Sequence, residues 1–334
     1  RPKLGRSGDV ITAPDRGERF GHCLARHAAE VLDTLGGGSI LEFGAGSGTL
    51  AATLLNQLGS LGCLPEEYLI LELSADLRRR QQEALSTRAA AHSARVRWLD
   101  TLPAGLEGVV LANEVLDAMP VKVFEQERDG SIWEMGVTAD AGQEGAFCWE
   151  RREADEPLRA AVRALGIEIQ GARYRSEIAQ QASAWIQGLG GVLDRGVVFL
   201  VDYGFRQQEY YHPDRSGGTL MCHYRHRAHD DPFFLPGMQD ITSHVDFSAI
   251  AEAACRNGFT VAGYATQGAF LLSAGLLQAI PLDAPVKTQL ELAQEVKKLT
   301  LPHEMGELFK VLALSREYTP SLSGFAQQDH ADRL

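Results

Sequence analysis

The chain lacks the features that mark membrane proteins and disulfide-bonded proteins. No run of about 18 apolar residues occurs in its 334 residues, so we expect no membrane insertion. The first residues also lack the apolar core of a signal peptide. The five cysteines are scattered and form no CxxC pair, which is typical of reduced cytoplasmic thiols and argues against a zinc ribbon. We therefore expect a cytoplasmic protein.

An excess of positive charge is also missing. Lysine and arginine total 32 against 44 aspartates and glutamates, which gives a formal net charge of −12. A protein that grips a phosphate backbone needs a basic surface, so nucleic acid is excluded as the expected partner. An acidic surface instead attracts a basic peptide.

Short apolar stretches alternate with helical stretches in the first third of the chain. The pattern predicts helices over residues 22–37, 47–62 and 74–91, the last opened by Ser74 as its N-cap. It predicts strands over residues 39–46, 67–73 and 94–100, and a fourth within 108–120 that runs into a loop. This alternation indicates an α/β fold with a mostly parallel sheet and helices on both faces.

The alternation breaks after residue 120. We interpret residues 121–175 as an insertion that contains a β-hairpin at Asp129-Gly130. Residues 176–334 then hold the second half of the sheet, with strands expected at 196–204, 259–267 and 307–317, and further C-terminal helices. The polar and aromatic loop 205–245 is too long for a simple connection, and we expect it to act as a lid over a substrate cleft.

A glycine-rich turn follows the first predicted strand, in the sequence ILEFGAGSGTLAATLL. Gly44, Gly46 and Gly48 give GxGxG, so the third glycine does not fit the dinucleotide pattern GxGxxG. Glu42 lies just before the turn, where a carboxylate repels a pyrophosphate and suits the ammonium group of S-adenosylmethionine. We therefore expect a site for S-adenosylmethionine here, with a purely structural turn as the alternative.

Two acidic residues end the next strands. Glu72 follows the second strand, where it can accept hydrogen bonds from the two ribose hydroxyls of the cofactor. Asp100 ends the third strand, where it can accept from the exocyclic amine of adenine. The alternatives are a solvated carboxylate at a helix start for Glu72 and ordinary turn chemistry for Asp100.

Motifs along nearly the whole chain, from about Asp9 to Ser315, resemble one family. The motifs are ITAPDRGERFGHCLA, LEFGAGSGTLA, ANEVLDAMPVKVFE, RSEIA, LVDYG, GTLMCHYRH, PGMQDITSHVDF, TQGAFLLSAGL and MGELFKVLALS. They are similar to those of the MidA family, the bacterial relatives of the mitochondrial complex I assembly factor and protein arginine methyltransferase NDUFAF7. ANEVLDAMPV and QDITSHVDF are specific to that family.

The resemblance implies a class I methyltransferase fold, S-adenosylmethionine as cofactor and S-adenosylhomocysteine as product. It also implies a protein or peptide substrate methylated on arginine, with a respiratory complex subunit as one candidate. One departure lies near the N-terminus, where Asp15 follows Thr12-Ala13-Pro14 and the spacing to Phe20-Gly21 differs from the family pattern.

The loop after the fourth strand is the expected place of methyl transfer, because ligands of parallel sheets bind beyond the carboxyl ends of the strands. A protonated guanidinium must be held by carboxylates that also receive its proton. Glu114 and Asp117 can share one face if the loop begins a helix, and Asn113 can bind acceptor or cofactor. The alternative is a cluster at a helix N-terminus.

Further candidate residues come from the second half of the chain. Asp202 and Tyr203 end the fifth strand, where their side chains can face the cleft, and Glu177 can enter it from the insertion. The alternative for each of them is a structural role. The histidines of MCHYRHRAHDD alternate with arginines, whose charge opposes a cation, so we predict no metal site. His244 and Asp246 are expected to fix the long loop by hydrogen bonds.

Other functions stay open at this point. The chain can instead methylate an oxygen or nitrogen of a small metabolite, with the lid enclosing it. It can also be an assembly factor that keeps the fold without catalysis. An NAD-dependent dehydrogenase is disfavoured by the glycine spacing. The insertion and the C-terminal helices can also serve a homodimer.

Overall fold

A seven-strand path forms the centre of the molecule, and one short strand is added to it. The computed structural model describes residues 18–142, 145–225, 227–278 and 285–334. The order across the sheet is β14 (Thr260–Thr266), β15 (Phe309–Arg316), β9 (Leu193–Phe205), β4 (Leu106–Asn113), β1 (Ser39–Phe43), β2 (Tyr68–Leu71) and β3 (Val96–Leu99). All neighbours are parallel except β15, which is antiparallel to β9 and to β14. The short β13 (Val245–Asp246) pairs in parallel with the last two residues of β9.

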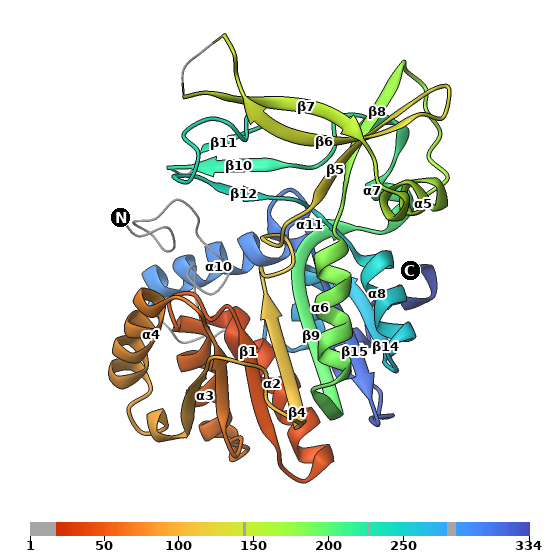
Figure 1. Cartoon of the computed structure of the whole chain (residues 1–334). Helices are drawn as coiled ribbons and strands as arrows, with labels where there is room; N and C mark the ends of the chain where they lie inside the picture. The colour runs from red at the N-terminus through yellow and green to blue at the C-terminus, as the bar shows by residue number, and fades with distance from the viewer. Residues whose placement is uncertain (1–17, 143–144, 226, 279–284) are drawn as a thin grey trace.

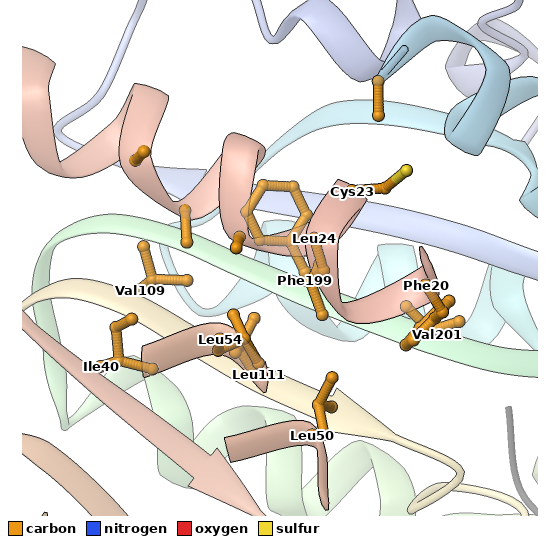
Figure 2. Packing of buried hydrophobic residues seen from close by; sticks show 14 of the residues in the cluster. Phe20, Cys23, Leu24, Ile40, Leu50, Leu54, Val109, Leu111, Phe199 and Val201 are labelled. Carbon is orange, nitrogen blue, oxygen red and sulfur yellow. The ribbon is translucent and has the colours of Figure 1, made fainter. Parts of the chain in front are cut away.

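The inner strands β1, β4, β9 and β15 are mostly buried on both faces, which explains their mainly apolar sequences. Successive residues point to opposite sides, so Ile40 and Val109 join one hydrophobic cluster while Leu41 and Val110 join the other. Figure 2 shows the first cluster, in which Phe199 of β9 packs against the helix formed by residues Arg19–Leu35. The core is therefore divided in two by the sheet.

Helices cover the hydrophobic cluster on each face of the central sheet. The first cluster is covered by α2 (Arg19–Leu35), α3 (Thr49–Leu61), α4 (Ala75–Arg88), α9 (Gln267–Ser273) and α10 (Val286–Thr300). The second is covered by α6 (Gln180–Gly190) and α8 (Phe247–Arg256). Ser74 accepts a hydrogen bond from the amide of Leu77, as expected of an N-cap. Of the described helices, none is both long and apolar enough to cross a membrane.

The insertion forms a second, antiparallel sheet at the end of the molecule toward which β4 points (Figure 1). Its order is β7 (Phe147–Glu153), β6 (Ile132–Ala139), β5 (Lys122–Glu127) and β8 (Arg173–Ile178), and α5 (Glu156–Ala164) packs on it. The sheet ends at Ile178, three residues beyond the expected boundary of 175. Residues 176–178 form the end of β8, since they pair with β5.

The long segment 205–245 has more structure than its sequence indicated. It contains the short helix α7 (Gln207–Tyr210) and a three-stranded sheet in the order β11 (Arg227–His229), β10 (Met221–Tyr224) and β12 (Asp240–Thr242). These strands are only three or four residues long, which is why alternation did not reveal them.

Glu177 ties this segment to the insertion. Its buried carboxylate accepts hydrogen bonds from the amide and hydroxyl of Thr219, from the amide of Leu220 at 3.4 Å and from the hydroxyl of Tyr210 at 3.3 Å. Burial raises the pKa of Glu177, against the effect of these donors. The expectation that Glu177 enters the cleft is wrong, because every one of these contacts is structural.

Replacing Glu177 with Gln should loosen this segment, because an amide group would then face backbone N–H donors. We expect a local loss of about 2 kcal/mol and faster hydrogen exchange around Thr219 and Leu220, measured by mass spectrometry. The matched control is Glu127→Gln in the same sheet, whose carboxylate pairs with Arg151 on the surface. Unchanged exchange in the Glu177 variant would show that the segment is held by other contacts.

Candidate functional site

The glycine turn lies between β1 and α3, beside the point where the chain order across the sheet reverses. The φ angles of Gly44, Gly46 and Gly48 are 62°, 51° and 78°. Only glycine adopts this left-handed region without steric cost. Three such residues in five bend the backbone sharply and begin α3 at Thr49, so that its first amides point out of the turn.

Two other segments press against the turn. A Cβ atom on Gly48 would lie 3.0 Å from the Cα of Gln81 in α4. A Cβ atom on Gly44 would lie 3.2 Å from Cγ2 of Val115, which follows β4. The turn after β1 is thus packed directly against the turn after β4, and the two form one site.

Glu42 is buried at the end of β1. Its carboxylate accepts a hydrogen bond of 2.7 Å from the hydroxyl of Tyr68 on β2. Burial raises the pKa of Glu42 to about 7, and the hydrogen bond from Tyr68 opposes that rise. The carboxylate is therefore an internal group of the sheet, and its role toward a cofactor ammonium stays a prediction.

Glu72 lies at the end of β2 and is held by two donors. One oxygen accepts from the amide of Ser74 and the other from Nε2 of Gln81. Gln81 also donates to the carbonyl oxygen of Gly46 and accepts from the indole of Trp98 on β3. One fully buried glutamine thus connects the glycine turn with the ends of β2 and β3.

Asp100 lies beyond β3 with its side chain largely exposed. Arg78 of α4 donates to its carboxylate at 2.7 Å and to the carbonyl oxygens of Leu99 and Glu72. Arg78 therefore fixes Asp100 relative to Glu72. The predicted contacts of these two carboxylates with adenine and ribose stay predictions.

Asp202 organises the turn after β4. Its Oδ2 accepts hydrogen bonds from the backbone amides of Val115, Leu116 and Asp117 at 3.2, 3.0 and 3.2 Å, and its Oδ1 accepts from the amide of Tyr203. Burial and the nearby carboxylates of Asp117 and Glu114 raise the pKa of Asp202, while the amide donors oppose this rise. Asp202 is therefore a positioning residue.

Asp117 lies in this turn and is also buried. Its Oδ2 accepts a hydrogen bond of 2.5 Å from the hydroxyl of Tyr203. Its Oδ1 has no hydrogen-bond partner among the described residues. Burial raises the pKa of Asp117 to about 6. A buried carboxylate oxygen without a donor is suited to an incoming cation.

Asn113 and Glu114 end β4. The side-chain amide of Asn113 donates to Oε1 of Glu114 at 3.4 Å, and its Oδ1 is buried without a partner among the described residues. Glu114 has a φ of 52°, which is unusual for a residue other than glycine. Such strain is typical of functional turns, and here the amide of Glu114 still donates to the carbonyl of Val201.

Two expectations about this turn are wrong. Glu114 and Asp117 do not share a helix face, because residues 114–120 form a turn and no helix begins there. The carboxylate of Asp202 does not face a cleft, since it is 1% exposed and bound to backbone amides. The structure nonetheless brings Asn113, Glu114 and Asp117 together beside the glycine turn, while Asp100 lies on the far side of β2.

The other described candidate residues from the second half of the chain contact protein groups away from the glycine turn. Asp246 caps α8 by accepting from the amides of Ser248 and Ala249, so these bonds hold the start of that helix and not the long loop. The ring of His244 stacks on Phe205, and burial lowers its pKa to about 4. His226 and Asp15 lie outside the described residues. Among the residues that are described, no three His, Cys, Asp or Glu side chains gather as metal ligands would.

Comparison with known proteins decides the family. The model of a family of S-adenosyl-L-methionine-dependent methyltransferases matches residues 23–265, which is more than half of the chain. The chain belongs to this methyltransferase family. The match spans the glycine turn, the turn after β4, the insertion and β9.

Two solved structures from Burkholderia thailandensis resemble the methyltransferase over 100% of its length. One is a protein bound to S-adenosyl-homocysteine, with 44% identity, 86% of that chain covered and a TM-score of 0.94. The other is a native crystal structure with 46% identity, 88% coverage of that chain and a TM-score of 0.91. The α/β methyltransferase fold and the cofactor S-adenosylmethionine are therefore confirmed, and a dehydrogenase is excluded.

More distant relatives have been named by their substrate. A Drosophila melanogaster protein named protein arginine methyltransferase NDUFAF7 homolog, mitochondrial, is 27% identical over 94% of this chain and 76% of its own. The Danio rerio protein arginine methyltransferase NDUFAF7, mitochondrial, is 25% identical over 93% of this chain and 77% of its own.

Replacing Gly46 with Val should weaken binding of S-adenosylhomocysteine at least about 100-fold, because the side chain would fill the inner surface of the turn. Isothermal titration calorimetry measures this. The control is Gly62→Val at the end of α3, where φ is 74° and a Cβ would meet nothing within 4 Å. Gly62→Val also places a side chain at a left-handed backbone position, but away from the site. Equal losses of affinity in the two variants would show that the glycine turn does not bind the cofactor product.

Glu42 should make the folded protein less stable as pH rises. Its folded pKa of about 7 lies above the usual value of 4.5, so between these values the folded state holds a proton that the unfolded state has lost. Urea unfolding at pH 5 and pH 8 should show wild type losing on the order of 2 kcal/mol more than Glu42→Gln. Parallel pH profiles for the two proteins would contradict this.

Proposed function

We propose that this methyltransferase transfers its methyl group to an arginine side chain of a protein. The observation that carries the proposal is the buried Oδ1 of Asp117, which has no partner among the described residues and lies on the turn packed against the glycine turn. The names of the relatives support the same acceptor. A respiratory complex subunit as the bearer of that arginine stays a prediction from the family resemblance.

The residues present fit the cofactor. The three glycines with left-handed φ angles carry no side chain on the turn, and Asn113 presents a buried amide oxygen without a partner among the described residues. When bound, S-adenosylmethionine supplies an electrophilic methyl carbon and leaves as the neutral thioether S-adenosylhomocysteine. Glu72, with two donors already in place, offers its remaining acceptor capacity at the end of β2.

An arginine acceptor carries a positive charge, so the enzyme needs carboxylates to bind it. Asp117 and Glu114 would hold the guanidinium by charge-assisted hydrogen bonds and orient one nitrogen for in-line attack. As the new nitrogen–carbon bond forms and the carbon–sulfur bond breaks, that nitrogen loses a proton. A carboxylate with a pKa raised to about 6, such as Asp117, holds that proton more readily than an ordinary aspartate.

A direct test uses S-adenosylmethionine with an isotopically labelled methyl group. Synthetic arginine peptides, the same peptides with lysine in place of arginine, and a set of small amines and alcohols are incubated with the enzyme. We expect label on arginine nitrogen by mass spectrometry. Label on the small molecules alone would overturn the proposal and assign a metabolite methyltransferase.

Glu114→Gln should leave binding of S-adenosylhomocysteine largely intact and lower arginine methylation at least about 100-fold. Asp117→Asn should do the same, because the amide no longer attracts the guanidinium. The matched control is Glu107→Gln at the opposite end of β4, where the carboxylate pairs with Arg195 on the surface. If Glu114→Gln loses the cofactor product as well, Glu114 belongs to the cofactor site.

A further inference from the structure

A groove of about 680 Å³ lies beside the turn after β4. One wall is the insertion, through β6 and β7, and the other is the segment 232–243 that leads into and includes β12. The floor is the turn itself, from Asp117 to Val121. The groove has the size of a ligand site, since such sites measure about 300–1,000 Å³.

The groove is mostly apolar. Its walls are formed by large side chains, among them Met119, Met135, Phe147, Trp149, Phe233 and Ile241. Trp149 and Phe233 meet edge to face across it, with ring centroids 5.1 Å apart. Several apolar groups remain open to water, with Val137 at 57%, Phe147 at 45% and Ile241 at 43% exposure. These exposed apolar side chains gather on one groove beside the turn after β4.

One buried carboxylate oxygen beside the groove has no hydrogen-bond partner among the described residues. Glu134 is paired with Arg152 at 2.6 Å and with Lys122 at 3.8 Å. Asp117 also lines the groove, and its Oδ1 has no hydrogen-bond partner among the described residues. An occupant that suits both features carries a cation for Asp117 and apolar side chains for the walls.

We propose that this groove binds the substrate on either side of the methylated arginine and selects large apolar residues there. The inference rests on the proposed arginine methylation. It extends that function by naming the sequence class of the substrate. The position of the groove supports this proposal. Residues 117–121 line its floor, and they directly follow or belong to the turn that carries the carboxylates of Glu114 and Asp117.

The test compares two peptides in the presence of S-adenosylhomocysteine, Gly-Leu-Phe-Arg-Leu-Val-Gly and Gly-Ser-Ser-Arg-Ser-Ser-Gly. Calorimetry should show the apolar peptide binding at least about tenfold more tightly, the gain expected from burying one or more aliphatic side chains. Equal affinity would overturn the groove assignment and leave arginine recognition intact. Absence of binding by both peptides, with S-adenosylhomocysteine still bound, would count against arginine as the acceptor and so against both proposals.

Variants then locate the binding surface. Val137→Ser and Ile241→Ser should each weaken the apolar peptide about tenfold without changing affinity for the serine peptide or for S-adenosylhomocysteine. The matched control is Leu61→Ser, an apolar residue of 46% exposure at the end of α3 that should change nothing. If light scattering shows a dimer that Ile241→Ser dissociates, the groove is a contact between copies of this chain and the proposal fails.

Discussion

The geometry of the site depends on the hydrogen bonds that the buried carboxylate of Asp202 accepts. This carboxylate lies at the end of β9 and accepts hydrogen bonds from three consecutive amides of the turn after the neighbouring strand β4. Those amides would otherwise be buried without acceptors, which costs about 1–3 kcal/mol each. This constraint places Val115 against Gly44 and directs Asp117 toward Tyr203 and the groove. Asp202 thus fixes the position of the turn after β4 relative to the glycine turn and to the insertion that follows it.

A second constraint is the concentration of carboxylates in this part of the protein. Burial raises the pKa of Glu42 and Asp117, and burial with neighbouring carboxylates raises that of Asp202. Such groups reduce the stability of the fold at neutral pH, and perturbed pKa values of this kind gather at functional sites. In the proposed function, the carboxylate of Asp117 would attract the guanidinium of the acceptor.

The sequence predicted the central sheet well because its inner strands are mostly apolar and each is bounded by a helix or a turn. The glycine spacing and Glu42 also led to the correct cofactor. Contacts across the chain were not predictable in this way. Gln81 sits in a run of polar residues, and nothing in that run distinguishes the buried side chain that reaches Gly46, Glu72 and Trp98. Asp202 resembled a cleft residue because it ends a strand, yet the three amides it binds lie 85–87 positions away. The strands of segment 205–245 were too short to show a period.

In the proposed function, the turn after β4 holds a guanidinium beside the cofactor. A crystal structure of the enzyme with S-adenosylhomocysteine and an arginine peptide would show where the guanidinium binds. We expect a guanidinium nitrogen within hydrogen-bond distance of Oδ1 of Asp117, with the cofactor product on the glycine turn and apolar side chains of the peptide between Trp149 and Ile241. A peptide arginine bound elsewhere, with Asp117 contacting only protein and water, would contradict this proposal.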